Sequence, residues 1–513
     1  MSTTAPSPAD HWATFTRRVG KVRALNGVLG MLEWDQQVMM PRGSGPARAQ
    51  QTALLSEMHH ARVSSTELGD LAAVILSDAA QVPDLGPDLP DGPTRAAAAR
   101  AILSDHHRAC AVPADLVARL AHGRSAGFAA WRQAREDDDF AGFAPALDHI
   151  LDLVREQAAC HDVGEHPYDA ALEEFDPGTR VAHLKPMFAR LGEALVPLVQ
   201  ASRQAEGPAP LPLHVPDSAF KKLNHHILDA LGYDFDHGRL DLAAHPFSVG
   251  IHPLDVRITT RYRNDAPLST LGATIHEGGH ALYEQGLPVH LHGTGIAQAA
   301  GAGMHESQSR FWENQIGRSL AFFKWVRPAL EEAVGHPVDP DQLYAAANRI
   351  EPGLIRVEAD EATYNLHVIV RFELELGIFE GRLKAADLPE AWNAGYETWL
   401  GVDVPDMRQG VLQDIHWASG FFGYFPSYTL GNLYAAGFGA AVQDSLPTLW
   451  EDVENGHFQD ILAWLRQNVH SRGRITTAPQ IFADAVGERD PVADLMDHLY
   501  ARQGALYGIQ RPA

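Results

Sequence analysis

The pattern of apolar and polar positions predicts a mostly helical chain. Alanine- and leucine-rich segments with helical spacing of apolar residues alternate with short Pro/Gly-rich breaks, and sustained period-two alternation is rare. Two or three amphipathic helices are predicted over residues 9–80, with an interruption at 41–46. Helices resume at Thr94 after a Pro/Asp/Gly-rich stretch over 82–93, which we interpret as a surface loop rather than as a linker between domains.

Residues 240–262 are the exception to the helical pattern. Residues 247–251 and 255–262 read as short strands of a small sheet, since the second alternates and is rich in β-branched residues. An edge strand at this place could pair with the backbone of a peptide substrate. A purely structural hairpin fits the same pattern equally well.

The helix predicted over 268–285 carries the segment His276-Glu277-Gly278-Gly279-His280. Residues four apart share a helix face, so both imidazoles can bind one metal ion. Glu277 can then take a proton from a water molecule that attacks a carbonyl group. The adjacent glycines, each unfavourable in a helix by roughly 1 kcal/mol, suggest close approach of the metal or its neighbours on their face. The alternative is an ordinary buried helix with a hydrogen-bonded His pair.

A catalytic zinc needs a third protein ligand and one open position. The metzincin pattern is excluded, because position 286 is Gly where that class has His. A second helix, predicted over 304–313, carries Glu306 and would bring it beside the His pair if the two helices run antiparallel. His290, His292 and His305 are rival ligands; the first two lie in the expected loop, and His305 points about 100° away from Glu306 on a helix.

A long helix is predicted from Ile355 to about Gly381, with Arg356, Asp360 and Tyr364 on one stripe. An arginine in such an apolar context can bind a carboxylate with two hydrogen bonds. An internal salt bridge between Arg356 and Asp360 is the alternative.

The segment 410–428 is dense in polar and aromatic residues and reads as a loop. A histidine or tyrosine on such a loop, such as His416, Tyr424 or Tyr428, can donate to a developing oxyanion. Simple packing of an aromatic cluster is the alternative.

Composition limits the classes of partner and the cellular compartment that fit this chain. The 513-residue chain has a formal net charge of −24, with 65 acidic against 41 basic residues, which disfavours nucleic acid and anionic membranes as partners. Two cysteines exclude a disulfide framework and favour a reducing compartment. No signal peptide and no run of 18 apolar residues is visible, so we expect a soluble, cytoplasmic protein.

Taken together, these segments resemble the thermostable carboxypeptidase family, also called the carboxypeptidase Taq type of metallocarboxypeptidase. The resemblance extends over nearly the whole chain and rests on ordered motifs. These are Glu33-Trp34-Asp35 with Met39-Met40-Pro41, His245-Pro246-Phe247, Asp255-Val256-Arg257-Ile258-Thr259, the motif at 276–280, His305-Glu306-Ser307-Gln308, Ile355-Arg356 with Ala359-Asp360-Glu361, and Gly410 with Gln413-Asp414-Ile415-His416-Trp417.

The resemblance implies an all-α fold of the neurolysin type, with a small β-sheet near the metal. We therefore expect residues 1–513 to form a single helical domain whose two lobes flank a deep central groove, and a homodimer. The implied activity is removal of single C-terminal amino acids from peptides, with broad specificity and poor action next to proline.

The resemblance also assigns roles to individual residues. His276, His280 and Glu306 would bind one Zn²⁺ per chain, or Co²⁺, and Glu277 would be the general base. His416 with Tyr428 or Tyr424 would stabilise the oxyanion. Arg356 would bind the terminal carboxylate, and the motifs add further candidate substrate-binding residues: His245, Arg257 and Gln413.

Two other functions fit parts of this pattern. An oligopeptidase or dipeptidyl carboxypeptidase would share the metal site, and the position of the carboxylate-binding residue relative to the metal would distinguish it. A non-catalytic helical binding protein with a structural metal is disfavoured by Glu277, since a structural metal has no use for a base.

Overall fold

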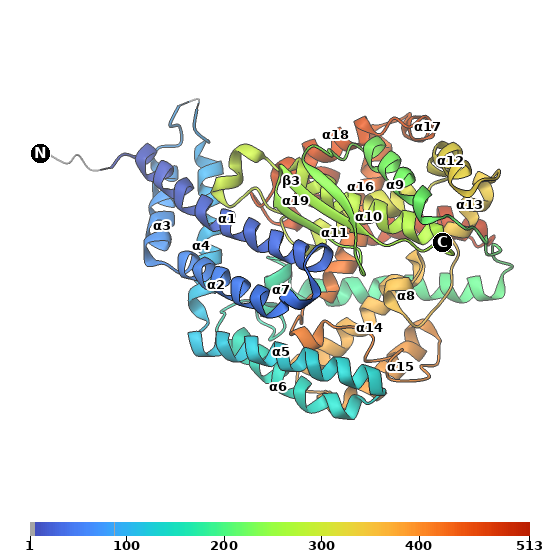
Figure 1. Cartoon of the computed structure of the whole chain (residues 1–513), viewed down its shortest axis with the longest axis horizontal. Helices are drawn as coiled ribbons and strands as arrows, with labels where there is room; N and C mark the ends of the chain where they lie inside the picture. The colour runs from blue at the N-terminus through green and yellow to red at the C-terminus, as the bar shows by residue number, and fades with distance from the viewer. Residues whose placement is uncertain (1–5, 87, 513) are drawn as a thin grey trace, which may run out of the picture.

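The computed structural model describes residues 6–86 and 88–512, and α-helices make up most of them (Figure 1). The N-terminal part contains α1 (Pro8–Val38), α2 (Gly45–Val63), α3 (Thr66–Gln81) and α4 (Gly92–Ala111). These bounds confirm the helices predicted over 9–80, with a 3₁₀ turn at Arg42–Ser44 where the interruption was expected. Asp91 caps α4, so this helix begins two residues before Thr94.

The N-terminal helices have a small apolar core of their own, to which the later segment around Leu291 and Ile296 also contributes. A much larger core extends from Leu116 in α5 to Tyr500 near the C-terminus. Its surrounding helices are α5 (Ala114–Asp137), α6 (Phe140–Ala159), α7 (Asp169–Phe175), α8 (Val181–Gln204), α9 (Asp217–Leu231), α12 (Leu320–Val334), α13 (Pro340–Ala347), α15 (Leu388–Leu400), α17 (Leu449–Glu454), α18 (Gln459–Asn468), α19 (Ala478–Val486) and α20 (Pro491–Leu499).

The small sheet has three strands in the order β1-β3-β2. The two strands predicted from sequence correspond to β2 (Ser248–His252) and β3 (Asp255–Thr260), which pair antiparallel. The third strand, β1 (Gly238–Leu242), pairs parallel with β3 and was not predicted. The sheet packs against α10 (Pro267–Gly286) and so lies beside the motif at 276–280 (Figure 1).

Three helices position the candidate site. α10 (Pro267–Gly286) packs against α11 (Ala302–Arg310), and α11 packs in turn against α16 (Phe425–Ser445). The helix predicted over 304–313 is thus confirmed up to Arg310, after which the backbone widens into a π-helical turn over Phe311–Gly317.

The prediction of one helix from Ile355 to Gly381 is wrong at its start. α14 covers Glu361–Phe379, and the side chain of Asp360 caps it by accepting hydrogen bonds from the backbone amides of Ala362 and Thr363. Arg356 lies before the helix in a 3₁₀ turn over Arg356–Glu358. The stripe of Arg356, Asp360 and Tyr364 on one helix therefore does not exist.

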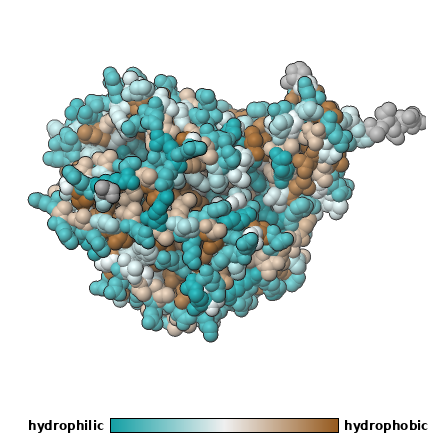
Figure 2. Space-filling model, turned by 180° about the vertical axis from the view of Figure 1, so that it is seen from behind, coloured by the Kyte–Doolittle hydropathy of each residue, from teal (hydrophilic) through white to brown (hydrophobic). Residues whose placement is uncertain are grey.

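In the described residues, no helix is long and apolar enough to cross a membrane. On the face shown in Figure 2, hydrophobic side chains lie in small groups among hydrophilic ones. Cys110 and Cys160 are both free thiols.

Candidate metal and catalytic site

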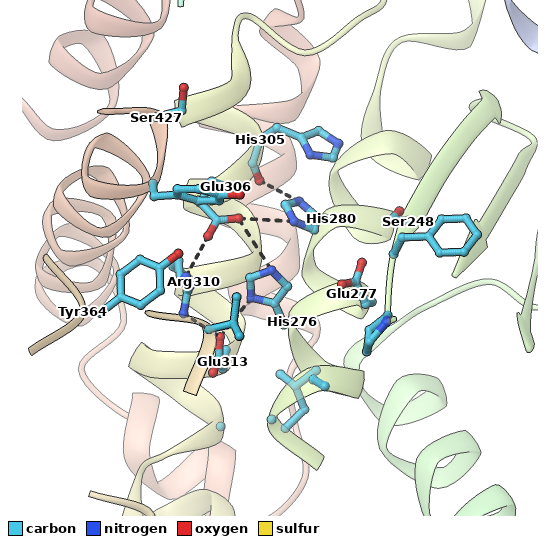
Figure 3. A pocket seen from close by; sticks show the side chains of 18 of the residues that line it. Ser248, His276, Glu277, His280, His305, Glu306, Arg310, Glu313, Tyr364 and Ser427 are labelled. Atoms are coloured by element: carbon cyan, nitrogen blue, oxygen red, sulfur yellow. Dashed lines mark hydrogen bonds and ion pairs between the residues drawn. The ribbon is translucent and has the colours of Figure 1, made fainter. Parts of the chain in front are cut away.

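Three side chains converge between α10 and α11 (Figure 3). His276, His280 and Glu306 offer ligand atoms that all lie within 4.8 Å of one another. The Nε2 atoms of His276 and His280 are 3.6 Å and 3.4 Å from Oε2 of Glu306. Because His276 and His280 are one helical turn apart, α10 places both imidazoles on one face.

The second nitrogen of each imidazole is already bonded. Nδ1 of His276 lies 2.9 Å from Oε2 of Glu313, and Nδ1 of His280 lies 3.0 Å from the carbonyl oxygen of His305. These bonds favour the tautomer that leaves each Nε2 free to bind a metal. The donor set of two imidazole nitrogens and one carboxylate oxygen therefore fits a catalytic metal ion.

Glu306 is buried but strongly supported. Nε of Arg310 donates to Oε1 at 2.8 Å, and the hydroxyl of Ser309 donates to Oε2 at 3.0 Å. Although burial opposes it, the charges of Arg310 and His276 lower the pKa of Glu306 well below its usual range. The carboxylate is thus ionised, as metal binding requires.

Glu277 lies beside the triad in a different environment. Its side chain is buried, and Oε2 has no hydrogen-bond partner in the described residues. Burial raises the pKa of Glu277 to about 7, which suits a group that accepts and returns a proton near neutral pH.

The glycines of the motif allow close approach between helices rather than access to the metal. A Cβ at Gly279 would lie 2.5 Å from the carbonyl oxygen of Gln308 and 2.7 Å from Cα of Ser309. A Cβ at Gly278 would lie 2.6 Å from a methyl group of Leu228. Gly279 therefore lets α10 and α11 meet at the backbone, which differs from the expectation made from sequence.

The rival histidines lie outside the triad. The ring of His305 stacks on that of His280 with centroids 4.4 Å apart, and its Nε2 pairs with Glu284 at 3.1 Å. His292 packs against His252, and His290 is exposed.

The triad opens into a cavity of about 1190 Å³. Arg356, Tyr424 and Tyr428 line it, as do Phe247 and Ser248 at the start of β2. His416 lies behind this wall, with its Nε2 at 3.2 Å from the hydroxyl of Tyr428. Burial raises the pKa of both tyrosines, that of Tyr424 to about 12, so both hydroxyls remain protonated donors at neutral pH.

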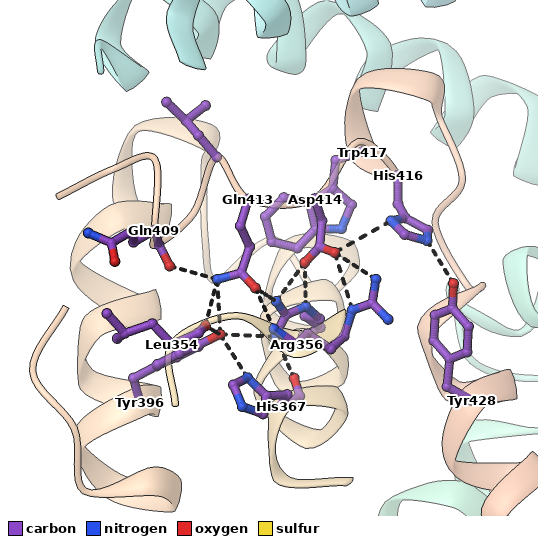
Figure 4. A network of polar contacts seen from close by, with 12 residues as sticks. Leu354, Arg356, His367, Tyr396, Gln409, Gln413, Asp414, His416, Trp417 and Tyr428 are labelled. Carbon is purple, nitrogen blue, oxygen red and sulfur yellow. Dashed lines mark hydrogen bonds and ion pairs between the residues drawn. The ribbon is translucent and has the colours of Figure 1, made fainter. Parts of the chain in front are cut away.

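Arg356 is held by a partner distant in sequence (Figure 4). Its Nε and one terminal nitrogen lie 3.2 Å and 2.8 Å from Oδ1 of Asp414, and its other terminal nitrogen lies 3.1 Å from the hydroxyl of Tyr364. The salt bridge to Asp360 weighed from sequence is absent, because Asp360 caps α14 instead.

Three candidate substrate-binding residues do not reach the cavity wall in the described structure. Gln413 is occupied by bonds to the backbone amide of Arg356 and to the carbonyl oxygens of Leu354 and Gln409. Arg257 binds Asp255, with its guanidinium 4.5 Å from the ring centre of Trp34. His245 is exposed to solvent.

Several supporting residues escaped the sequence analysis. Arg310 follows Glu306 by one helical turn, a spacing that predicts an ion pair between the two side chains. Arg371 stands in an otherwise apolar part of α14, and a buried arginine of this kind needs a partner. Nothing local connects Arg371 with Asp414 or Glu313 with His276, since these contacts join segments far apart in the chain.

Comparison with known proteins identifies the family of the chain. Residues 14–503 match the family described as carboxypeptidase Taq (M32) metallopeptidase. The chain is 41% identical to thermostable carboxypeptidase 1 of Thermus thermophilus over 491 residues, covering 93% of this chain and 94% of that protein. It is 35% identical to a second thermostable carboxypeptidase 1, from Pyrococcus furiosus, over 92% of this chain and 93% of that protein.

A solved structure has the same fold. The M32 carboxypeptidase of Deinococcus radiodurans R1 superposes with a TM-score of 0.91 at 35% identity, covering 97% of this chain and all of that one. The chain therefore belongs to the carboxypeptidase Taq (M32) metallopeptidase family and is a metallocarboxypeptidase.

Proposed function

We propose that this enzyme releases single amino acids from the free C-terminus of peptides, with one zinc ion held by His276, His280 and Glu306. The convergence of these three ligand atoms beside Glu277, whose Oε2 has no hydrogen-bond partner among the described residues, carries the proposal. Arg356 lines the same cavity. A zinc ion in such a set polarises the scissile carbonyl and lowers the pKa of water.

The residues of the chain supply the remaining steps. Glu277 takes a proton from the attacking water and returns it to the leaving amine. Tyr424 and Tyr428 are the candidate donors to the carbonyl oxygen as it gains negative charge, and His416 orients Tyr428 through their hydrogen bond. Substitution of each tyrosine by phenylalanine would show which of the two hydroxyls donates to the carbonyl oxygen.

The free C-terminus is recognised by charge. Arg356 is a buried guanidinium on the cavity wall, and a peptide carboxylate that loses its water there needs a cation. If one residue fits between this contact and the scissile bond, release is limited to single amino acids.

The peptide backbone offers contacts that do not depend on side chains. Phe247 and Ser248 of the β2 segment line the cavity, so pairing of substrate with this strand supports broad specificity. Proline has no N–H to donate, which is consistent with poor action next to it. We further propose a single domain with two lobes, a homodimer and a cytoplasmic location; Co²⁺ is an alternative metal.

One experiment tests the activity. A peptide with a blocked N-terminus is incubated with the enzyme, with and without a chelator, and its mass is followed over time. Loss of one C-terminal residue at a time, abolished by the chelator, is the expected result. Release of dipeptides would indicate a dipeptidyl carboxypeptidase, and internal cleavage an oligopeptidase.

A further inference from the structure

Arg371 in α14 shares a buried carboxylate with Arg356. Its side chain is fully buried, and its Nε lies 2.7 Å from Oδ2 of Asp414. The other oxygen of Asp414, Oδ1, accepts the two hydrogen bonds from Arg356. Two guanidinium groups thus divide one carboxylate between them.

This cluster has an uncompensated positive charge. Among the described residues, Asp414 is the only carboxylate paired with either arginine. His416 adds no charge, because burial lowers its pKa to about 3. Glu375, one turn beyond Arg371, accepts hydrogen bonds from Tyr168, Trp417 and Gly423 instead, and burial raises its pKa to about 7. Among the paired groups, two guanidinium groups and one carboxylate leave a net charge of about +1 in surroundings where charges are weakly screened.

Only one of the two arginines, Arg356, is exposed to the cavity. Arg356 lines the cavity, whereas Arg371 is enclosed by the ring of Trp392, the carbonyl oxygen of His367 and the side chain of Gln413. If Asp414 were paired with Arg356 alone, that pair would be neutral. An incoming carboxylate would then gain little from it.

We propose that Arg371 is a positioning residue that sets the preference for a free C-terminal carboxylate. Arg371 pairs with Oδ2 of Asp414 and so neutralises part of its negative charge. Arg356 therefore keeps a positive charge toward the cavity, while Oδ1 of Asp414 still holds it in place. This inference rests on the proposed function, in which Arg356 binds the terminal carboxylate of the substrate.

The test is a charge cycle with three variants: Arg371→Met, Asp414→Asn and the double variant. Arg371→Met should raise KM for an N-blocked dipeptide with a free carboxylate by about tenfold or more, with a much smaller effect on kcat. The double variant again has a net charge of +1, so its KM should fall most of the way back to the parental value. If Arg371 were purely structural, Tm and kcat would fall together with the rise in KM, whereas a loss of charge alone raises KM.

Arg95→Met is the matched control. Arg95 is also fully buried, but it donates to the backbone carbonyl oxygens of Pro90 and Val82 and lies in α4. Its loss should lower the Tm and leave KM unchanged. Metal content and Tm are measured for every variant.

Two results would overturn the inference: an unchanged KM in Arg371→Met, or a double variant no better than the single one. If Arg371→Met does not fold, Asp414→Asn alone decides. Its amide oxygen can still accept the hydrogen bonds that hold Arg356, and its charge of +2 should lower KM for the free acid, so an equal or higher KM contradicts the proposal. Failure of the proposed function is distinguishable, since the parent enzyme would then cleave the free acid and its C-terminal amide equally well.

Discussion

The carboxylates around the metal site differ in whether a cation faces them. Glu306 and Glu313 both bind Arg310, and Glu313 also binds Arg318 at 2.9 Å. Glu277 is equally buried but has no arginine partner in the described structure. Although burial opposes it, Arg310 with His276 and Arg318 lowers the pKa of Glu313, whereas burial raises that of Glu277. The pKa values of neighbouring glutamates thus shift in opposite directions, as the tasks proposed for Glu306 and Glu277 require.

Glu277→Gln should retain the metal and lose roughly 10²–10⁴-fold in kcat, because the amide is nearly isosteric yet cannot take a proton. Metal analysis and turnover are measured on the same sample. Glu332→Gln is the control, since Glu332 pairs with Lys222 on the surface. Near-parental activity with full metal occupancy would exclude Glu277 as the base.

Glu306→Ala should lower metal occupancy sharply, whereas His305→Ala should leave it largely intact. Glu306 supplies one of the three converging ligand atoms, while His305 supports His280 through its backbone carbonyl, which alanine preserves. Metal content after dialysis against metal-free buffer measures both. Stoichiometric metal in Glu306→Ala would mean that another residue is the third ligand.

The helices and strands that were predicted correctly are those with a regular local spacing of apolar residues. The helix carrying 276–280 and the strands β2 and β3 follow from apolar spacing over a few residues. The start of α14 was missed, although Asp360 before Glu361 is a recognisable N-cap signal. The parallel strand β1, the π-helical turn and the Arg356–Asp414 pair depend on tertiary contacts, so no local pattern indicates them.

Asp360→Ala should lower the free energy of unfolding by about 1–2 kcal/mol, since Asp360 caps α14 and also accepts a bond from the amide of Glu351. Asp360→Asn is the conservative control and should lower it less, because asparagine is an equally good N-cap. Denaturant unfolding compares the variants. An equal loss in both would indicate that the carboxylate charge, rather than capping, is what stabilises this turn.

For the molecule as a whole, the metal site joins separate parts of the fold. Two of the proposed ligands belong to α10 and the third to α11, while the residues that support them come from the π-helical turn and from α11 itself. A ligand that binds only the folded chain stabilises it, by about 2.7 kcal/mol at 100 times its Kd.

Chelation should therefore lower the Tm of the parent enzyme. The same treatment of His280→Ala should produce little shift, because this variant lacks one ligand and holds the metal weakly. Thermal unfolding followed by circular dichroism measures both. Equal shifts in the two proteins would show that the chelator acts elsewhere.

The contact of α10 with α11 at Gly279 implies an unusual pattern of mutational tolerance. Main-chain atoms of Gln308 and Ser309 face this glycine, and unlike side chains they cannot change rotamer to make room. Leu282→Ala, a large loss from the core, should reduce stability by about 2–5 kcal/mol yet leave metal affinity nearly unchanged. Gly279→Ala adds a single methyl group and should weaken metal binding by forcing the helices apart. We therefore expect metal binding to tolerate the loss of a large core side chain better than the addition of one methyl group at the contact between α10 and α11.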